Sequence, residues 1–163
     1  MTKRIVSDTG PIISLEKLSN GFEFIRKLYD KIIIPQAVLS ELSADSFEYP
    51  AEYLDFYSIK DLRMVRHVRE ISELAEIQRL DEGEKQAISL AHQLGLPLLI
   101  EETIGRHVAS SAGIPISGIA GQIVKSFKLE IISGKEASRK LGELYDSGRI
   151  NRRILNLLIS AIR

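Results

Sequence analysis

The sequence predicts one α/β domain in which a parallel sheet is covered by helices on both faces. Short apolar runs alternate with stretches whose apolar residues recur every three or four positions, as strands and amphipathic helices do. The run 97–100, Pro-Leu-Leu-Ile, is apolar throughout, which is typical of a strand buried on both faces. The chain has 163 residues, 44% of them hydrophobic, which is enough for one domain with a substantial core.

The first predicted strand, 5–6, is followed almost directly by Asp8. Gly10 and Pro11 end the strand, and a proline suits the first position of the helix whose apolar residues recur over 12–18. In a parallel sheet, such an acid faces the crevice at the carboxyl ends of the strands, where ligands bind. Asp8 is therefore the first candidate site residue.

The next segments continue the alternation of helix and strand. A helical pattern over 21–29 precedes the buried run 32–34, which ends at Pro35. The helix that Pro35 opens carries Glu41 on its apolar side, so Glu41 is the second candidate. A short helix that leads into an edge strand is expected over 53–59.

The segment 63–79 is charged and has helical spacing, so an exposed helix is expected there. The following helix begins at Asp81, a good N-cap, and Glu84 stands three residues later, at the spacing of a capping box. Glu84 also belongs to the apolar stripe of this helix. The two roles, cap and inward-facing site residue, can coexist. Gly95 ends the helix.

Two acids, Glu101 and Glu102, stand at the carboxyl end of the strand 97–100 and just before a helical pattern over 104–112. Acids are favoured at a helix N-terminus by the helix dipole, so the pair has a structural explanation beside a functional one.

The rest of the chain predicts more of the same fold and a helical extension. The remaining patterns are a strand at 114–116, a helix at 119–127 and a connector or edge strand at 131–132. A helical hairpin broken at 146–148 follows over 135–162. We expect a single domain, 1–163, with a core over about 1–132 and a C-terminal helical hairpin over about 133–163.

Positive charge is concentrated at the C-terminal end. Residues 121–163 carry nine Lys or Arg against four Asp or Glu, a net charge of +5, and residues 1–120 carry −5 because the chain has 22 of each kind. A basic end beside an acidic body suits a polyanion held over a carboxylate site. A solvated helical face explains any individual charge equally well.

Several classes of protein do not fit this composition. Without cysteine there is no disulfide framework, thiolate chemistry or Cys-based zinc site, which suits a reducing cytoplasm. The N-terminus does not have the pattern of a signal peptide, and no run is long enough to span a membrane. We expect a cytoplasmic protein that is not attached to a membrane.

The candidate site residues are carboxylates that stand at the exit of a strand or on the inward side of a helix: Asp8, Glu41, Glu84 and the pair Glu101 and Glu102. A ligand set made only of oxygens suits Mg²⁺ or Mn²⁺. Without a metal, clustered carboxylates repel one another and raise one another's pKa values. With one, they can activate a water molecule and stabilise the leaving oxygen of a phosphodiester.

The ordered set resembles the PIN-domain family, in particular its bacterial and archaeal branch with a Gly-Glu-x-x-Ala-Ile motif. The matching stretches are Ile-Val-Ser-Asp8-Thr9, Ile-Pro-x-x-Val-x-x-Glu41-Leu42, Leu-Asp-Glu-Gly-Glu84-x-x-Ala-Ile-x-Leu-Ala and Leu-Leu-Ile-Glu101-Glu102, within about residues 4–120. The resemblance implies a three-layer α/β/α fold with a parallel central sheet and Mg²⁺- or Mn²⁺-dependent endonuclease cleavage of RNA. Many members of the family are the toxin half of a toxin–antitoxin pair.

Carried over by motif, the resemblance implies site roles and partners. Asp8, Glu41, Glu84 and Glu102 would hold metal and act in catalysis, with Thr9 hydrogen-bonding nearby and Arg106 meeting phosphate. RNA would be the substrate, and the implied protein partners are an antitoxin and a second copy of the chain.

The fourth motif departs from the family pattern. The family usually has Asp, often an Asp-Asp pair, where this chain has Glu101 and Glu102, and Glu102 matches the metal-facing position better. The extra methylene moves a carboxylate by about 1 Å, a displacement that matters in catalysis. An alternative function is therefore a catalytically weakened PIN-like module that binds nucleic acid or protein.

Asp8-Thr9-Gly10 also spells the aspartic-protease signature, and a homodimer could supply its two acids. Those proteases are all-β proteins, whereas helical periodicity dominates this sequence. We therefore favour the nuclease interpretation over the protease.

Overall fold

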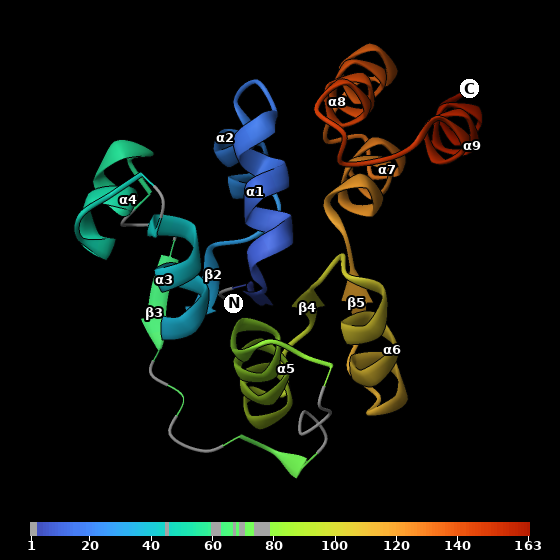
Figure 1. Ribbon diagram of the computed structural model, residues 1–163. Helices are drawn as coiled ribbons and strands as arrows, with labels where there is room; N and C mark the ends of the chain where they lie inside the picture. Colours follow the sequence, from blue (N-terminus) through green and yellow to red (C-terminus); the bar gives the residue numbers. More distant parts are fainter. Residues whose placement is uncertain (1–2, 45, 60–62, 67, 69–70, 74–78) are drawn as a thin grey trace.

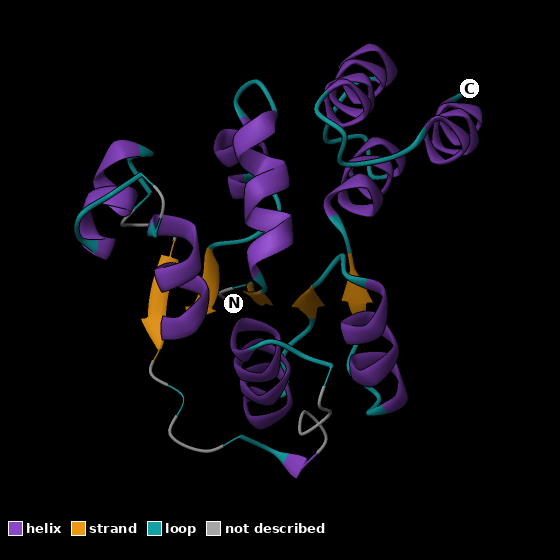
Figure 2. Ribbon diagram, viewed as in Figure 1, coloured by secondary structure: helices purple, strands orange, loops and turns teal. Residues whose placement is uncertain are grey.

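The computed structural model describes residues 3–44, 46–59, 63–66, 68, 71–73 and 79–163. It is a three-layer α/β/α arrangement with helices above and below one sheet (Figures 1 and 2). The described strands are β1 (Arg4–Ser7), β2 (Lys31–Pro35), β3 (Arg63–Arg66), β4 (Leu98–Leu99) and β5 (Ile116–Ser117). The fold class predicted from the sequence is confirmed.

All neighbouring strands are parallel, in the order β3-β2-β1-β4-β5. The chain builds outward from β1 to β2 and β3, and then crosses to the other side of β1 to add β4 and β5. Val6 at the centre pairs with Ile33 on one side and with Leu98 on the other. The order of the strands reverses between β1 and β4, and this is where open α/β sheets form their ligand crevice.

The helices are α1 (Thr9–Lys17), α2 (Gly21–Arg26), α3 (Gln36–Ser43), α4 (Pro50–Phe56), α5 (Glu82–Leu94), α6 (Thr103–Ser111), α7 (Ile119–Lys128), α8 (Gly134–Asp146) and α9 (Arg152–Ile162). Side chains alternate across each strand, so the sheet has two apolar faces. Ile5 and Ile32 belong to the core cluster shared with α1, α3, α7 and α8. Val6 and Ile33, one residue later in each strand, belong to the cluster shared with α5 and α6.

The C-terminal hairpin packs onto the first of these clusters. Leu141 and Leu144 of α8 are buried there, as is Ile162 at the end of α9. Most other residues of α9 are at least partly exposed, and Leu157 is 63% exposed. The division into a core of about 1–132 and a hairpin of about 133–163 stays a prediction.

The helix predicted over 63–79 is wrong at its start, because 63–66 form the edge strand β3. Pairing with β2, in the register Ile33 to Met64, overrides the helical spacing of the charged residues. Residues 68, 71 and 72 have no regular structure, and 67, 69–70 and 74–78 lie outside the described residues.

The edge strand expected at the end of 53–59 is also wrong, because residues 57–59 follow α4 without forming a strand and the Ile59 backbone N–H donates back to the Leu54 carbonyl. The remaining predicted boundaries are close to the observed ones. Asp81 caps α5 by accepting a hydrogen bond from the Glu84 backbone N–H at 2.8 Å, and Gly95 ends this helix with φ +64°. The strand predicted at 114–116 is found at 116–117, and residues 131–132 form a connector. None of the described helices combines the length and the apolar character needed to cross a bilayer.

Candidate functional site

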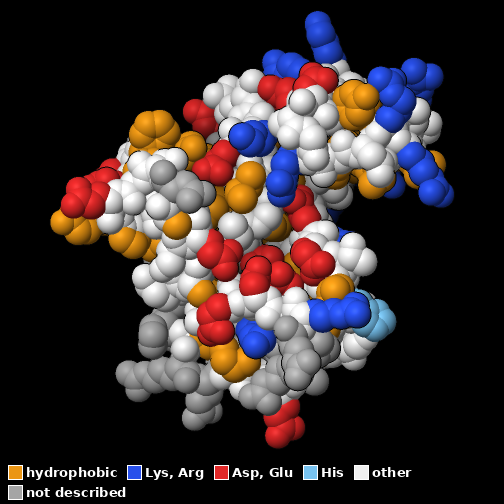
Figure 3. All heavy atoms as spheres, viewed as in Figure 1, with side chains coloured by type: hydrophobic (Ala, Val, Ile, Leu, Met, Phe, Trp, Pro, Cys, Tyr) orange, Lys and Arg blue, Asp and Glu red, His pale blue; other side chains and the backbone are white. Residues whose placement is uncertain are grey.

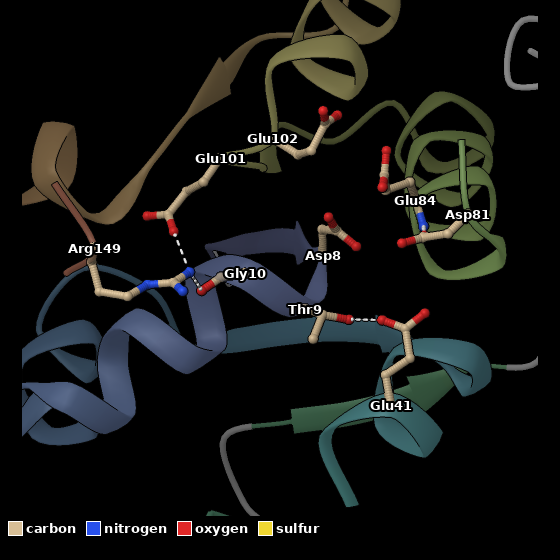
Figure 4. A pocket seen from close by; sticks show the side chains of 9 residues that line it. All are labelled: Asp8, Thr9, Gly10, Glu41, Asp81, Glu84, Glu101, Glu102 and Arg149. Atoms are coloured by element: carbon tan, nitrogen blue, oxygen red, sulfur yellow. Dashed lines mark hydrogen bonds and ion pairs between the residues drawn. The ribbon is translucent and has the colours of Figure 1, made fainter. Parts of the chain in front are cut away.

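An acidic pocket lies at the carboxyl ends of the strands, beside the point where the strand order reverses. It is lined by Asp8, Thr9, Gly10, Glu41, Asp81, Glu84, Glu101, Glu102 and Arg149 (Figure 4). In the space-filling view, acidic side chains gather in the middle of the face, whereas Lys and Arg side chains concentrate over the C-terminal helices (Figure 3). The uneven charge along the sequence is thus also uneven in space.

Asp8 is the most enclosed acid of the pocket. It follows β1 directly and occupies the N-cap position of α1, but its side chain makes no capping hydrogen bond. The residue is only 5% exposed, and Oδ1 is buried without a hydrogen-bond partner. Burial raises the pKa of Asp8 to about 7, against the opposing effect of the Thr9 backbone N–H. The value of about 7 includes the effect of the neighbouring carboxylates, which raise the pKa in the same direction as burial.

Glu84 is the second enclosed acid, and it lies in the first turn of α5. Asp81 caps the helix through the Glu84 backbone N–H, and the Glu84 side chain faces the pocket (Figure 4). The residue is 8% exposed, and Oε2 is buried without a hydrogen-bond partner. Burial raises the pKa of Glu84, as do a hydrogen bond to Asp81 and the nearby charges of Asp8 and Glu102.

Glu41 reaches the pocket from α3, which packs against α5. Its Oε2 accepts a hydrogen bond from Thr9 Oγ1 at 2.5 Å. Gly83 makes room for this side chain, because a Cβ at position 83 would lie 2.5 Å from Glu41 Oε1. A larger residue at position 83 would therefore require the Glu41 carboxylate to shift.

Glu102 caps α6 and faces the other acids at the same time. Its Oε2 accepts a hydrogen bond from the Gly105 backbone N–H at 2.7 Å. A Cβ at Gly105 would lie 3.2 Å from Glu84 Oε2 and 3.5 Å from Glu102 Oε2, so both carboxylates approach this glycine. Glu102 can therefore cap α6 and still take part in the acidic pocket.

Glu101 behaves differently from its neighbour in the chain. Its Oε1 accepts from Ser14 Oγ at 2.8 Å and pairs with Arg149 Nη2 at 3.2 Å. Its Oε2 accepts from the Ile119 backbone N–H at 3.1 Å. Both oxygens are therefore satisfied, and Glu101 links the end of β4 to α1, α7 and the α8–α9 loop.

Five of the six predicted site residues line this pocket, namely Asp8, Thr9, Glu41, Glu84 and Glu102. The sixth, Arg106, is not among the described residues that line it. Arg106 Nη1 donates to the Ile100 carbonyl at 2.8 Å, which ties the side chain to the backbone at the end of β4. The roles assigned to all six residues stay predictions.

Two charged residues of the pocket were not predicted from the sequence as site residues. Asp81 was expected only as a helix cap, but it also lines the pocket. Arg149 lies in the loop between α8 and α9, where nothing in the local pattern indicates that it contacts Gly10, 139 residues away in the chain. The basic character of the C-terminal segment was the only available signal.

Comparisons with known proteins agree on the fold. A family model described as "PIN domain" matches residues 4–163. A PilT N-terminus domain protein from the hyperthermophilic archaeon Sulfolobus solfataricus P2 superposes with a TM-score of 0.58 at 18% identity, over 76% of this chain and 92% of that one. At this identity the likeness concerns the fold alone.

A domain of a functionally unknown protein from Methanocaldococcus jannaschii DSM 2661 is also similar, with a TM-score of 0.45 and 25% identity. That match covers 71% of this chain and 90% of the other. No curated protein matches the sequence.

Proposed function

Because the chain belongs to the PIN-domain family, whose members are generally nucleases, we propose that it is a divalent-metal-dependent endoribonuclease that hydrolyses RNA phosphodiester bonds. One observation carries the proposal. Carboxylates from four separate segments, Asp8, Glu41, Glu84 and Glu102, line one pocket at the carboxyl ends of the strands. Two of their oxygens, Asp8 Oδ1 and Glu84 Oε2, are buried there without a hydrogen-bond partner.

The residues of the pocket fit a divalent cation. Buried carboxylate oxygens without partners are unfavourable unless a cation or a proton compensates them. Asp8 and Glu84 would therefore be the principal ligands, and an oxygen-only set suits Mg²⁺ or Mn²⁺. Within the described part of the chain, no three acidic or histidine side chains already form a ligand group. Glu41 and Glu102 would complete the ligand set of Asp8 and Glu84.

The ion, when bound, supplies Lewis-acid activation of water and neutralises charge on the phosphodiester. The residues of the chain would orient the carboxylates and hold protons. Thr9 Oγ1 orients Glu41, and the Gly105 backbone N–H orients Glu102. The raised pKa values of Asp8 and Glu84 allow either side chain to hold a proton near neutral pH in the absence of metal.

The experiment that tests this proposal is cleavage of single-stranded and structured RNA. We expect cleavage with Mn²⁺, and its loss both in EDTA and in Asp8→Asn. Equal cleavage under all three conditions would mean that a contaminant or another site is responsible.

The finer biological role follows from the family resemblance alone. The protein would be the toxin of a toxin–antitoxin pair in the cytoplasm, with an antitoxin protein as its partner and a homodimer as its assembly. Co-purification of a small protein with the chain would support the toxin–antitoxin role. A monomeric mass by light scattering at micromolar concentration would exclude the dimer.

A second candidate function is a PIN-fold module that binds RNA or protein with weakened catalysis. The observation that favours it is the hydrogen bond from the Gly105 backbone N–H to Glu102 Oε2, which already occupies the carboxylate that departs from the family pattern. The substitution Glu102→Asp separates the two candidates. A large gain in cleavage indicates an impaired site in the wild type. Absence of metal binding in both forms leaves only the binding module.

A further inference from the structure

Arg149 is the one cationic side chain among the described residues that line the acidic pocket. It lies in the loop between α8 and α9, so it comes from the C-terminal hairpin and not from the segments that supply the acids. Figure 4 shows its guanidinium group on the Gly10 and Glu101 side of the pocket. Arg149 is therefore the side-chain cation that a negatively charged ligand in the pocket can contact.

The guanidinium group is held in place by three neighbours. Nε donates to Ser14 Oγ at 3.0 Å, and Nη2 donates to the Gly10 carbonyl at 3.0 Å and to Glu101 Oε1 at 3.2 Å. Ser14 is fully buried, so this hydrogen bond ties the guanidinium group to the core. An arginine that is fixed in this way loses little further conformational entropy when it binds a ligand.

Arg149 nevertheless keeps the means to bind an anion. Its side chain is 28% exposed, and none of the described residues accepts a hydrogen bond from Nη1. The ion pair with Glu101 uses Nη2 alone, so it leaves the Nη1 hydrogens for another acceptor. The planar guanidinium group suits phosphate oxygens, with which it forms charge-assisted hydrogen bonds.

We propose that Arg149 is a phosphate-binding residue of this pocket and contacts the RNA backbone beside the acidic cluster. The inference rests on the proposed function, since it takes RNA as the ligand. It also gives the C-terminal hairpin a role in the site: the α8–α9 loop supplies the positive charge that brings a polyanion to a group of carboxylates.

The competing explanation is that Arg149 only ties the hairpin to the core through Glu101. The substitutions Arg149→Gln and Glu101→Gln separate the two explanations. Both break the link between hairpin and core to a similar extent, but they should have opposite effects on phosphate binding. Loss of Arg149 removes the phosphate contact, whereas loss of the Glu101 charge leaves Arg149 in place and removes a competing anion. Arg153→Gln is the matched control, since it removes the same charge from an exposed position on α9.

The measurement is binding of a short fluorescein-labelled oligouridine by anisotropy at several KCl concentrations. All proteins carry Asp8→Asn, which we expect to suppress cleavage. We expect Arg149→Gln to raise the Kd about tenfold near 0.1 M salt. The slope of log K against log salt should become shallower by about 0.7, the value for one phosphate contact on a single strand. Glu101→Gln should bind as tightly as its parent or more tightly, and Arg153→Gln should lose distinctly less affinity than Arg149→Gln.

The inference is overturned if Arg149→Gln keeps the affinity and salt slope of its parent, if Glu101→Gln weakens binding as much as Arg149→Gln, or if no protein binds the RNA. Cleavage with Mn²⁺, measured on the same substitutions without Asp8→Asn, tests the proposed function separately. If no protein cleaves but the salt slope still depends on Arg149, the nuclease proposal fails and the phosphate site stands.

Discussion

The charged side chains on the two sides of the acidic pocket differ in whether they have hydrogen-bond partners. On one side, Asp8 and Glu84 are buried with oxygens that no described residue satisfies. On the other side, Glu101 is satisfied at both oxygens, and Arg149 is held by three hydrogen bonds. The contrast separates acids whose buried oxygens lack a hydrogen-bond partner from an acid that is fully hydrogen-bonded, although all of them stand at the ends of strands or helices.

The difference also explains why two consecutive glutamates have different roles. Glu101 and Glu102 follow the same strand, but successive side chains near a strand's end point to opposite sides. Glu102 turns toward Glu84 around Gly105, and Glu101 turns toward Ser14 and Arg149. Substitutions on the two sides of the pocket should therefore differ in kind as well as in size.

The largest expected effect is on cleavage. Asp8→Asn should lower the rate of RNA cleavage with Mn²⁺ by about a hundredfold to a thousandfold, as expected when one group that supports developing charge is lost. The control is Glu82→Gln, which removes an exposed acid from the same turn as Glu84 and should cleave like the wild type. Similar losses in both variants would mean that general charge, and not the enclosed acid, determines the rate.

The next effect is on the pH dependence of stability in EDTA. The pKa of Asp8 is raised to about 7 in the folded state from 3.8, so between these pH values the folded protein binds more protons than the unfolded chain. The contribution of Asp8 is therefore fully favourable below about pH 4 and is lost as the pH rises through 7. Relative to Asp8→Asn, the wild type should lose up to about 1.4 kcal/mol of unfolding free energy per pH unit in this window.

Urea unfolding of both proteins at several pH values measures this difference. Glu84, whose pKa is also raised, contributes in the same direction and remains in both proteins. A free-energy difference between wild type and Asp8→Asn that does not change from pH 4 to 7 would show that Asp8 is ionised and compensated in the folded state without metal.

A smaller effect is the response to metal. A ligand that binds only the folded state at ten times its Kd adds about 1.4 kcal/mol to the unfolding free energy. For a domain of this size, that corresponds to a rise in Tm of about 3–6 °C. We expect Mn²⁺ to raise the Tm of the wild type and of Glu101→Gln alike, and that of Asp8→Asn distinctly less. Equal shifts in all three proteins would remove Asp8 from the metal site.

The smallest expected effect is the loss of unfolding free energy when the Glu101–Arg149 ion pair is removed. Glu101 and Arg149 form an ion pair whose side chains are 24% and 28% exposed, so solvent screens much of their attraction. Glu101→Gln or Arg149→Gln should lower the free energy of unfolding by about 1 kcal/mol or less. Urea unfolding in EDTA measures this loss. A loss of several kcal/mol in either variant would mean that this linkage is essential to the fold.

Local patterns were sufficient for much of the architecture. Buried strands of apolar residues and caps such as Asp81 depend on contacts within a few residues, so their positions could be read along the chain. The same holds for Asp8 and Glu84, because the exit of a strand and the apolar stripe of a helix are local properties. The family resemblance found in these motifs is confirmed by the match over residues 4–163.

What the sequence determined by itself is therefore the α/β class, the order of most elements and a short set of acids at strand and helix ends. Only the tertiary structure decided that 63–66 is an edge strand, that Glu101 is satisfied while Asp8 and Glu84 are not, and that Arg149 reaches the pocket. Each of these depends on partners distant in the chain: β2 for the strand, Ser14 and Ile119 for Glu101, Gly10 for Arg149. Hydrogen bonds and desolvation depend on which groups meet in space, and sequence spacing records only neighbours along one element.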